Sequence, residues 1–253
     1  MAQTSDTTAG PPGAGHALWV RACHWLIAAS VLALAYSGVV ILMAHPRLYW
    51  GNTGNDLTRA WIELPISRNY HHGGWAAPLA FFAEPGGPVS SVRTYDIFNQ
   101  NGWARSLHFL VGWALGLGFL AYLAIGLLTG RLKAIVPALR ELAPGHHLAD
   151  LRAHLSLPLP RAPGGPPYNV LQKCAYAAVV FLGLPVMILS GLAMSPAAGA
   201  AWRWIPALFG GAQSARSVHF IVLCALALFV LVHLAMVLLT GFWRQIRAMT
   251  WGS

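Results

Sequence analysis

Charged side chains are scarce in this chain. Only 9% of its 253 residues are Asp, Glu, Lys or Arg, and only seven of these are acidic. Hydrophobic residues make up 57%, a composition that excludes an ordinary soluble domain. The scarcity of charge therefore predicts a membrane protein. The formal net charge of +9 then reflects membrane topology, so nucleic acid is not an expected partner.

Cysteine is also rare. The three cysteines, Cys23, Cys174 and Cys224, all lie in or at the ends of apolar stretches. Their spacing is neither that of a disulfide framework nor that of a cysteine metal site.

Long apolar runs are what the sequence has in abundance. Four of them are longer than the roughly 20 residues that a helix needs to cross a bilayer core. They cover about 18–43, 107–129, 170–194 and 217–241. Each must be a helix, because lipid offers the backbone no hydrogen-bond partner. The prediction is an all-α membrane protein, a four-transmembrane-helix bundle.

The segments between these spans divide the chain. Residues 1–16 are small and polar, as in a disordered tail, and the first span lacks the features of a cleaved signal, so 17–253 forms the membrane domain. The loop 44–104 is rich in Trp, Tyr and Phe and is expected to form a small folded cap. The loop 131–169 is basic and then rich in Pro and Gly, as in a semi-extended connector.

Basic residues set the expected topology. With four spans, both termini lie on one side of the membrane. Placing them in the cytoplasm puts nine Lys and Arg residues inside against seven outside, and both lysines, Lys133 and Lys173, inside. The prediction is a protein of the bacterial cytoplasmic membrane whose termini and loop 131–169 are cytoplasmic and whose loop 44–104 is periplasmic.

The last span contains two histidines, His219 and His233. It is otherwise strongly apolar, with no charged side chain between Arg216 and Arg244. Fourteen residues of α-helix advance about 21 Å and turn about 1400°, so the two side chains face the same way, one near each membrane edge. Burying an imidazole without a partner costs several kcal/mol. Each histidine is therefore expected to bind something.

Histidines in the other spans lie at matching depths. His24 and His233 are both near the cytoplasmic edge, and His108 and His219 both lie just inside the periplasmic edge. Two pairs of neutral imidazoles stacked across a membrane are what two b-type haems with bis-histidine ligation require. No Cys-x-x-Cys-His sequence is present, which excludes covalent c-type attachment.

Arginines accompany these histidines. RACH, RSLH and RSVH each place an arginine three residues before the histidine, at Arg21, Arg105 and Arg216. This spacing puts the guanidinium on the same helix face, one turn nearer the interface, where haem propionates would lie. For His233 the nearest equivalent is Arg244, eleven residues on and again on about the same face of a regular helix.

One histidine in each of the first two spans and two in the last resemble the bacterial di-haem cytochrome b subunits of nickel-iron hydrogenase, formate dehydrogenase and thiosulfate reductase. The resemblance covers the four spans and implies haem ligation by His24, His108, His219 and His233. It also implies electron transfer between quinone and an extracytoplasmic redox subunit of the molybdenum- or iron-sulfur-containing kind. The length of the loop 44–104 most resembles the thiosulfate reductase-like branch of this family. The loop is the expected docking surface for the redox subunit.

The start of the third span, PPYNVLQKCAY, resembles a Tyr-Asn-x-x-Gln-Lys stretch of formate dehydrogenase cytochromes beside their quinone site. This resemblance makes Tyr168, Asn169, Gln172 and Lys173 candidate quinone contacts. Asn169 is equally suited to cap the third helix, and Lys173 to anchor it at the interface.

The function predicted is an electron-transfer subunit of a respiratory oxidoreductase complex, not a catalyst by itself. One alternative is a stand-alone membrane quinone oxidoreductase acting on superoxide or another small acceptor. Another is a transporter with a histidine relay for protons or metal, which would need acidic residues inside the spans. All seven acidic residues lie in loops or the tail.

Overall fold

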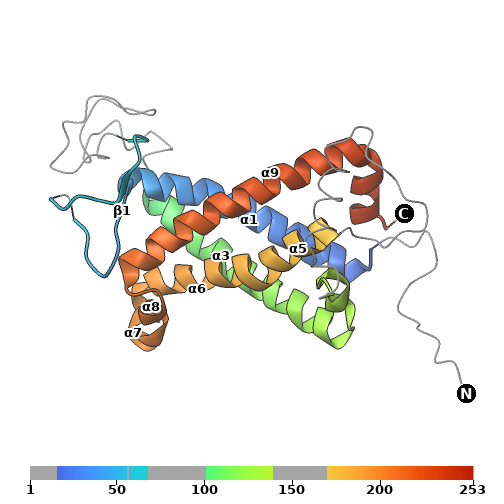
Figure 1. The fold of residues 1–253 in the computed structure, drawn as a ribbon, viewed down its shortest axis with the longest axis horizontal. Helices are drawn as coiled ribbons and strands as arrows, with labels where there is room; N and C mark the ends of the chain where they lie inside the picture. Colours follow the sequence, from blue (N-terminus) through green and yellow to red (C-terminus); the bar gives the residue numbers. More distant parts are fainter. Residues whose placement is uncertain (1–15, 56, 68–100, 139–169, 253) are drawn as a thin grey trace, which may run out of the picture.

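The structure is a computed structural model that describes residues 16–55, 57–67, 101–138 and 170–252 (Figure 1). Its elements are α1 (Leu18–Ala44), β1 (Arg47–Leu48), β2 (Ile62–Glu63), α3 (Asn101–Leu128), η2 (Arg131–Ile135), α5 (Val170–Ala178), η4 (Val179–Gly183), α6 (Leu184–Met194), α7 (Pro196–Ala201), α8 (Trp204–Leu208) and α9 (Ala212–Thr250).

The four predicted spans are confirmed as helices. They correspond to α1, α3, the continuous stretch from α5 through η4 to α6, and α9, each long and apolar enough to cross a membrane. The predicted tail lies almost wholly outside the described residues, as do most of the loops 44–104 and 131–169.

The helices form two pairs. α1 packs along α3, and α6 packs along α9, whereas α1 and α9 approach each other at far fewer points. The start of α1 and the end of α9 lie together at one end of the bundle, called here the termini end (Figure 1). β1, α7 and α8 lie at the opposite end, called here the hairpin end (Figure 1).

The hairpin end contains structure that the apolar pattern did not predict. β1 and β2 pair antiparallel, with Arg47 opposite Glu63 and Leu48 opposite Ile62. The chain over 45–67 is called here the hairpin segment. An added Cβ at Gly54 would lie 2.3 Å from the Tyr49 ring, so only glycine leaves room for that ring.

The fourth helix starts five residues before the predicted 217–241, because the hairpin segment caps it. The Gly51 carbonyl oxygen accepts hydrogen bonds from the backbone N–H groups of Gln213 and Ser214 at 3.0 and 3.1 Å. These are donors that a helix start leaves without an internal partner. Gly211 precedes them with φ +126°, and an added Cβ there would lie 2.4 Å from the Gly51 oxygen. The hairpin segment and α9 are therefore joined at the hairpin end.

The fourth helix also ends later than predicted, and it bends. Gly241 has φ 111° and ψ 87°, outside the helical region, and beyond it the chain turns back toward α1 (Figure 1). Arg21 donates through Nη1 to the Thr250 carbonyl at 2.7 Å, and Trp25 donates through Nε1 to the Met249 carbonyl at 2.9 Å. The C-terminal turn is thereby attached to the start of α1.

An apolar cluster fills the middle of the bundle. Phe119, Leu184, Met187 and Leu226 are all buried and come from α3, α6 and α9. Just before Leu184 the third span widens into the π-turn η4. Pro185 explains the widening, because proline lacks the N–H that an α-helix would use there and its ring displaces the carbonyl four residues earlier.

Candidate functional site

Two pairs of histidines face each other between the helices. The ring centroids of His24 on α1 and His233 on α9 are 6.3 Å apart, with 52° between the ring planes. The ring centroids of His108 on α3 and His219 on α9 are also 6.3 Å apart, with 60° between the planes. The first is called here the termini-end pair and the second the hairpin-end pair. The structure thus brings together the same partners that depth alone predicted.

The separation within each pair suits one metal atom between two imidazoles. A metal–nitrogen bond of about 2 Å, plus about 1.1 Å from nitrogen to ring centroid, places two axial imidazoles about 6 Å apart between centroids. The observed 6.3 Å in both pairs agrees with this sum. A direct hydrogen bond between the two imidazoles of a pair could also explain the short separation. Among the described residues, neither pair makes such a bond.

The two pairs form separate layers. α9 is continuous between His219 and His233, since its break in helical geometry lies at Gly241, so the layers are about 21 Å apart along the helix. Leu226 lies seven residues from each histidine and belongs to the buried apolar cluster. A buried cluster of apolar side chains therefore lies between the layers.

The ring nitrogens differ between the layers. Nδ1 of His24 is buried and has no hydrogen-bond partner among the described residues. Nδ1 of His108 lies 2.9 Å from the Ser37 hydroxyl oxygen, and Nδ1 of His219 lies 2.9 Å from the Ser190 hydroxyl oxygen. A buried imidazole nitrogen without a partner is costly, so the site around His24 is incomplete without a further group.

The helices that carry each pair leave lateral room. α9 packs mainly on α6, and it meets α1 at few points, so the paired histidines reach across from helices that are not packed tightly together. On α3, an added Cβ at Gly112 or Gly116 would meet no atom within 4 Å. Opposed imidazoles and small residues beside them fit a flat, metal-centred group such as a porphyrin.

The arginines predicted beside the histidines have separate surroundings. Arg216 is partly buried and donates through Nη2 to the His45 carbonyl, in addition to its place one turn before His219. Arg21 is attached to Thr250, and its buried Nε has no hydrogen-bond partner within the described part of the chain. Arg105 is exposed. Each guanidinium has five donors, and the described residues show one hydrogen bond from Arg216 and one from Arg21, so other donors of each are available to a further group.

The prediction that Arg244 lies on the same helix face as His233 is wrong. It assumed a regular helix over eleven residues, whereas Gly241 interrupts the helix between them. The Arg244 side chain is exposed and donates through Nη2 to the Thr240 carbonyl at 2.7 Å, across the Gly241 break.

The candidate quinone residues are only partly described. Tyr168 and Asn169 lie outside the described residues, and Gln172 and Lys173 are partly buried in the first turn of α5. One turn further, the Tyr176 ring meets Phe229 edge to face at 6.2 Å, and Phe229 stacks on His233 at 5.9 Å with 16° between planes. The start of α5 is therefore linked to the termini-end pair through two aromatic rings.

Sequence reasoning missed Phe229, Tyr176, Ser37 and Ser190. Aromatic residues and serines are common in spans, and their roles depend on contacts between helices. One signal was present: a Ser-Gly step occurs in the first and third spans, at Ser37–Gly38 and Ser190–Gly191.

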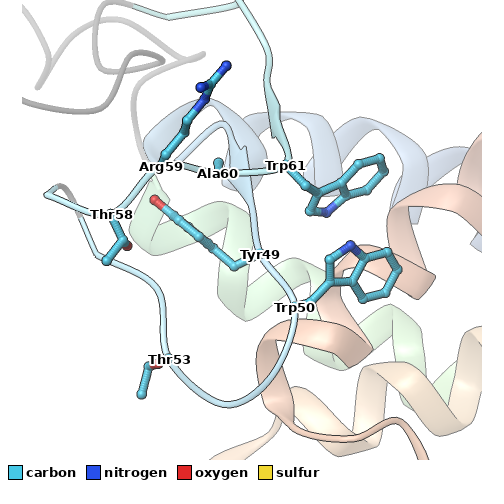
Figure 2. Close-up of a pocket in the computed structure, with 7 residues that line it drawn as sticks. All are labelled: Tyr49, Trp50, Thr53, Thr58, Arg59, Ala60 and Trp61. Carbon is cyan, nitrogen blue, oxygen red and sulfur yellow. The ribbon is translucent and has the colours of Figure 1, made fainter.

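The hairpin segment presents an aromatic surface next to the hairpin-end pair. The indole rings of Trp50 and Trp61 stack at 5.4 Å and line a shallow pocket of about 350 Å³ together with Tyr49, Thr53, Thr58, Arg59 and Ala60 (Figure 2). Trp61 also donates through Nε1 to the Ser217 hydroxyl at 3.0 Å, two residues before His219. This surface is thus attached to the helix that carries the site.

Comparison with known proteins agrees with this architecture. The family model described as prokaryotic cytochrome b561 matches residues 15–252. The chain is 30% identical over 231 residues to the putative protein-methionine-sulfoxide reductase subunit YedZ1 of Azospira oryzae, covering 88% of this chain and 90% of that protein. No solved structure matches the chain. The resemblance to cytochrome b subunits predicted from the histidine pattern is confirmed, whereas the thiosulfate reductase-like branch remains a prediction.

Proposed function

The chain belongs to the prokaryotic cytochrome b561 family, and from this premise we propose that it binds two haem b groups and transfers electrons between the quinone pool and a periplasmic redox partner. Proteins of this family bind haem b and transfer electrons within the membrane. The chain is accordingly a multi-pass protein of the bacterial cytoplasmic membrane, as predicted. The observation that carries the proposal is the equal 6.3 Å spacing of two histidine pairs in separate layers.

The proposed ligands are the four histidines of the pairs. His24 and His233 would hold one haem at the termini end, and His108 and His219 the other at the hairpin end. When bound, haem supplies a one-electron redox centre at each layer. The chain contributes the ligating nitrogens, the spacing along α9 and the apolar cluster around Leu226 between the layers.

Arginines near the layers would stabilise the haem propionates. Arg216 and Arg105 precede the hairpin-end histidines by three residues, and Arg21 precedes His24 by three. Arg216 is the strongest of these candidates, because its partly buried guanidinium is already directed to the hairpin end by the His45 carbonyl.

The redox partner is proposed to dock at the hairpin end, on the surface formed by the loop 44–104, with that end facing the periplasm. Exposed aromatic side chains support this, since Trp50 and Trp61 are 54% and 43% exposed next to the helix that carries His219. Aromatic residues are enriched at protein interfaces. The relative YedZ1 is named a reductase subunit, which supports a partner that carries the catalytic site. A molybdenum- or iron-sulfur-containing partner is proposed from the resemblance of the histidine pattern to the cytochrome b subunits named above.

Quinone is proposed to bind at the termini end, next to His233. Gln172 and Lys173 can donate hydrogen bonds to quinone carbonyls, with Tyr168 and Asn169 as further candidates that lie outside the described residues. The contact from Tyr176 to Phe229 and from Phe229 to His233 supports this position, because it brings the start of α5 near the termini-end pair.

Lys173→Ala is expected to raise the KM for quinol about tenfold, because one charge-assisted hydrogen bond is worth about 1.5 kcal/mol or more. The measurement is quinol-dependent haem reduction in detergent over a range of quinol concentrations. Lys133→Ala, in the exposed 3-10 turn η2, is the matched control and should leave the KM unchanged. An unchanged KM in both variants would remove Lys173 from the proposed site.

A reduced-minus-oxidised absorption spectrum of the purified chain tests the proposal as a whole. We expect the spectrum of low-spin b-type haem and a ratio of two haems per chain, because each histidine pair offers two axial nitrogens to one iron. A ratio of one, or a high-spin spectrum, would contradict two bis-histidine sites. Co-purification of a periplasmic protein then separates an electron-transfer subunit from a stand-alone oxidoreductase.

A further inference from the structure

Two buried serines contact the hairpin-end histidines, although neither serine is near its histidine in sequence. Ser37 on α1 and Ser190 on α6 both have 0% of their surface exposed. The Ser37 hydroxyl oxygen lies 2.9 Å from Nδ1 of His108, and the Ser190 hydroxyl oxygen lies 2.9 Å from Nδ1 of His219. The same contact therefore occurs once in each packed helix pair, α1 with α3 and α6 with α9.

Each serine also has a backbone carbonyl as neighbour, which favours one direction for the hydrogen bond between serine and histidine. The Ser37 hydroxyl lies 2.7 Å from the Ala33 carbonyl oxygen, and the Ser190 hydroxyl lies 3.1 Å from the Met187 carbonyl oxygen. A carbonyl can only accept, so a hydroxyl that donates to it leaves the serine oxygen able to accept from the histidine. In this arrangement Nδ1 is the protonated ring nitrogen and the lone pair lies on Nε2.

The residue after each serine holds the ring in place. An added Cβ at Gly38 would lie 3.3 Å from Cε1 of His108, and one at Gly191 would lie 3.5 Å from Cε1 of His219. Each imidazole therefore rests against the backbone of the neighbouring helix at a Ser-Gly step. The glycine sets the distance and the serine sets the orientation of the ring.

We propose that Ser37 and Ser190 are positioning residues that fix the tautomer and orientation of His108 and His219, and that they lower the reduction potential of the haem which these histidines would hold. The inference rests on the proposed function. A hydrogen bond from the second ring nitrogen raises the basicity of a ligating imidazole, and a more basic ligand favours the oxidised iron.

The test is a potentiometric titration of the full chain with Ser37→Ala, Ser190→Ala and the double variant. The expected result is two haems per chain, a more positive potential for the hairpin-end haem in each variant, a larger shift in the double variant, and an unchanged termini-end haem. The low-spin electron paramagnetic resonance signal of the hairpin-end haem should change as well, since it depends on the imidazole orientation. Selective loss of that haem would also support the proposal, because an unheld ring binds iron poorly.

Ser30→Ala is the matched control, because Ser30 is a serine of the same helix α1, is only 3% exposed and lies two turns before Ser37. It should leave both potentials unchanged. Unchanged potentials and resonance signals in Ser37→Ala and Ser190→Ala, with two haems present, would overturn the inference and leave the proposed function standing. If the unsubstituted chain itself lacked the hairpin-end haem, the proposed function would fail at that layer, and the inference would fail with it.

Discussion

His233→Ala is expected to remove one haem from the chain and to leave the other in place. His233 supplies one of two axial nitrogens at the termini end, and its ring centroid is 6.3 Å from that of His24. Loss of one strong axial bond leaves a single imidazole in an apolar site, which is insufficient to retain a low-spin haem. The hairpin-end pair is about 21 Å away along α9 and shares no ligand with it. The measured ratio should fall from two haems per chain to one.

Double substitution sharpens this expectation. If His24 and His233 hold the same haem, His24→Ala combined with His233→Ala should lose no more haem than either change alone, which is the non-additivity expected of residues that act as a unit. Combining His233→Ala with His219→Ala should remove both haems. His45→Ala is the control, since His45 belongs to neither pair and stacks on Tyr49. Two haems retained in His233→Ala would contradict the ligand assignment.

His219→Ala is expected to abolish electron transfer from quinol to an acceptor at the hairpin end. Quinol should still reduce the termini-end haem that remains. Without the hairpin-end pair, an electron at the termini end faces about 21 Å of bundle that contains the apolar cluster around Leu226. The measurement uses proteoliposomes, with quinol in the lipid and membrane-impermeant ferricyanide outside, and records both ferricyanide reduction and the haem absorbance.

The comparison with His233→Ala gives the order of the two layers. His233→Ala should retain the hairpin-end haem, but quinol should no longer reduce it, because the quinone site is proposed next to the termini-end pair. The two variants therefore fail in different steps, although each has one haem. Ferricyanide reduction by His219→Ala at the rate of the unsubstituted chain would contradict the proposed sequence of layers.

Much of the architecture was predictable because lipid restricts the choices. Four long apolar runs without acidic residues must be helices, and each one appears at nearly its predicted position. Helix ends were predicted less well, because they depend on contacts with distant segments. The Gly51 carbonyl extends the start of α9, and Gly241 redirects its end toward Arg21. The prediction that Arg244 shares a helix face with His233 was wrong because Gly241 interrupts the helix between them.

The sequence by itself determined the four spans and the common face of His219 and His233, because hydrophobicity and a 3.6-residue period act within a single helix. Depth alone also predicted which histidines come together. Only the tertiary structure decided that α1 packs on α3 and α6 on α9, and that Ser37 and Ser190 meet the hairpin-end imidazoles. Those contacts join residues up to 71 positions apart, and they depend on how each helix is rotated against its neighbour, which the period of one helix does not specify.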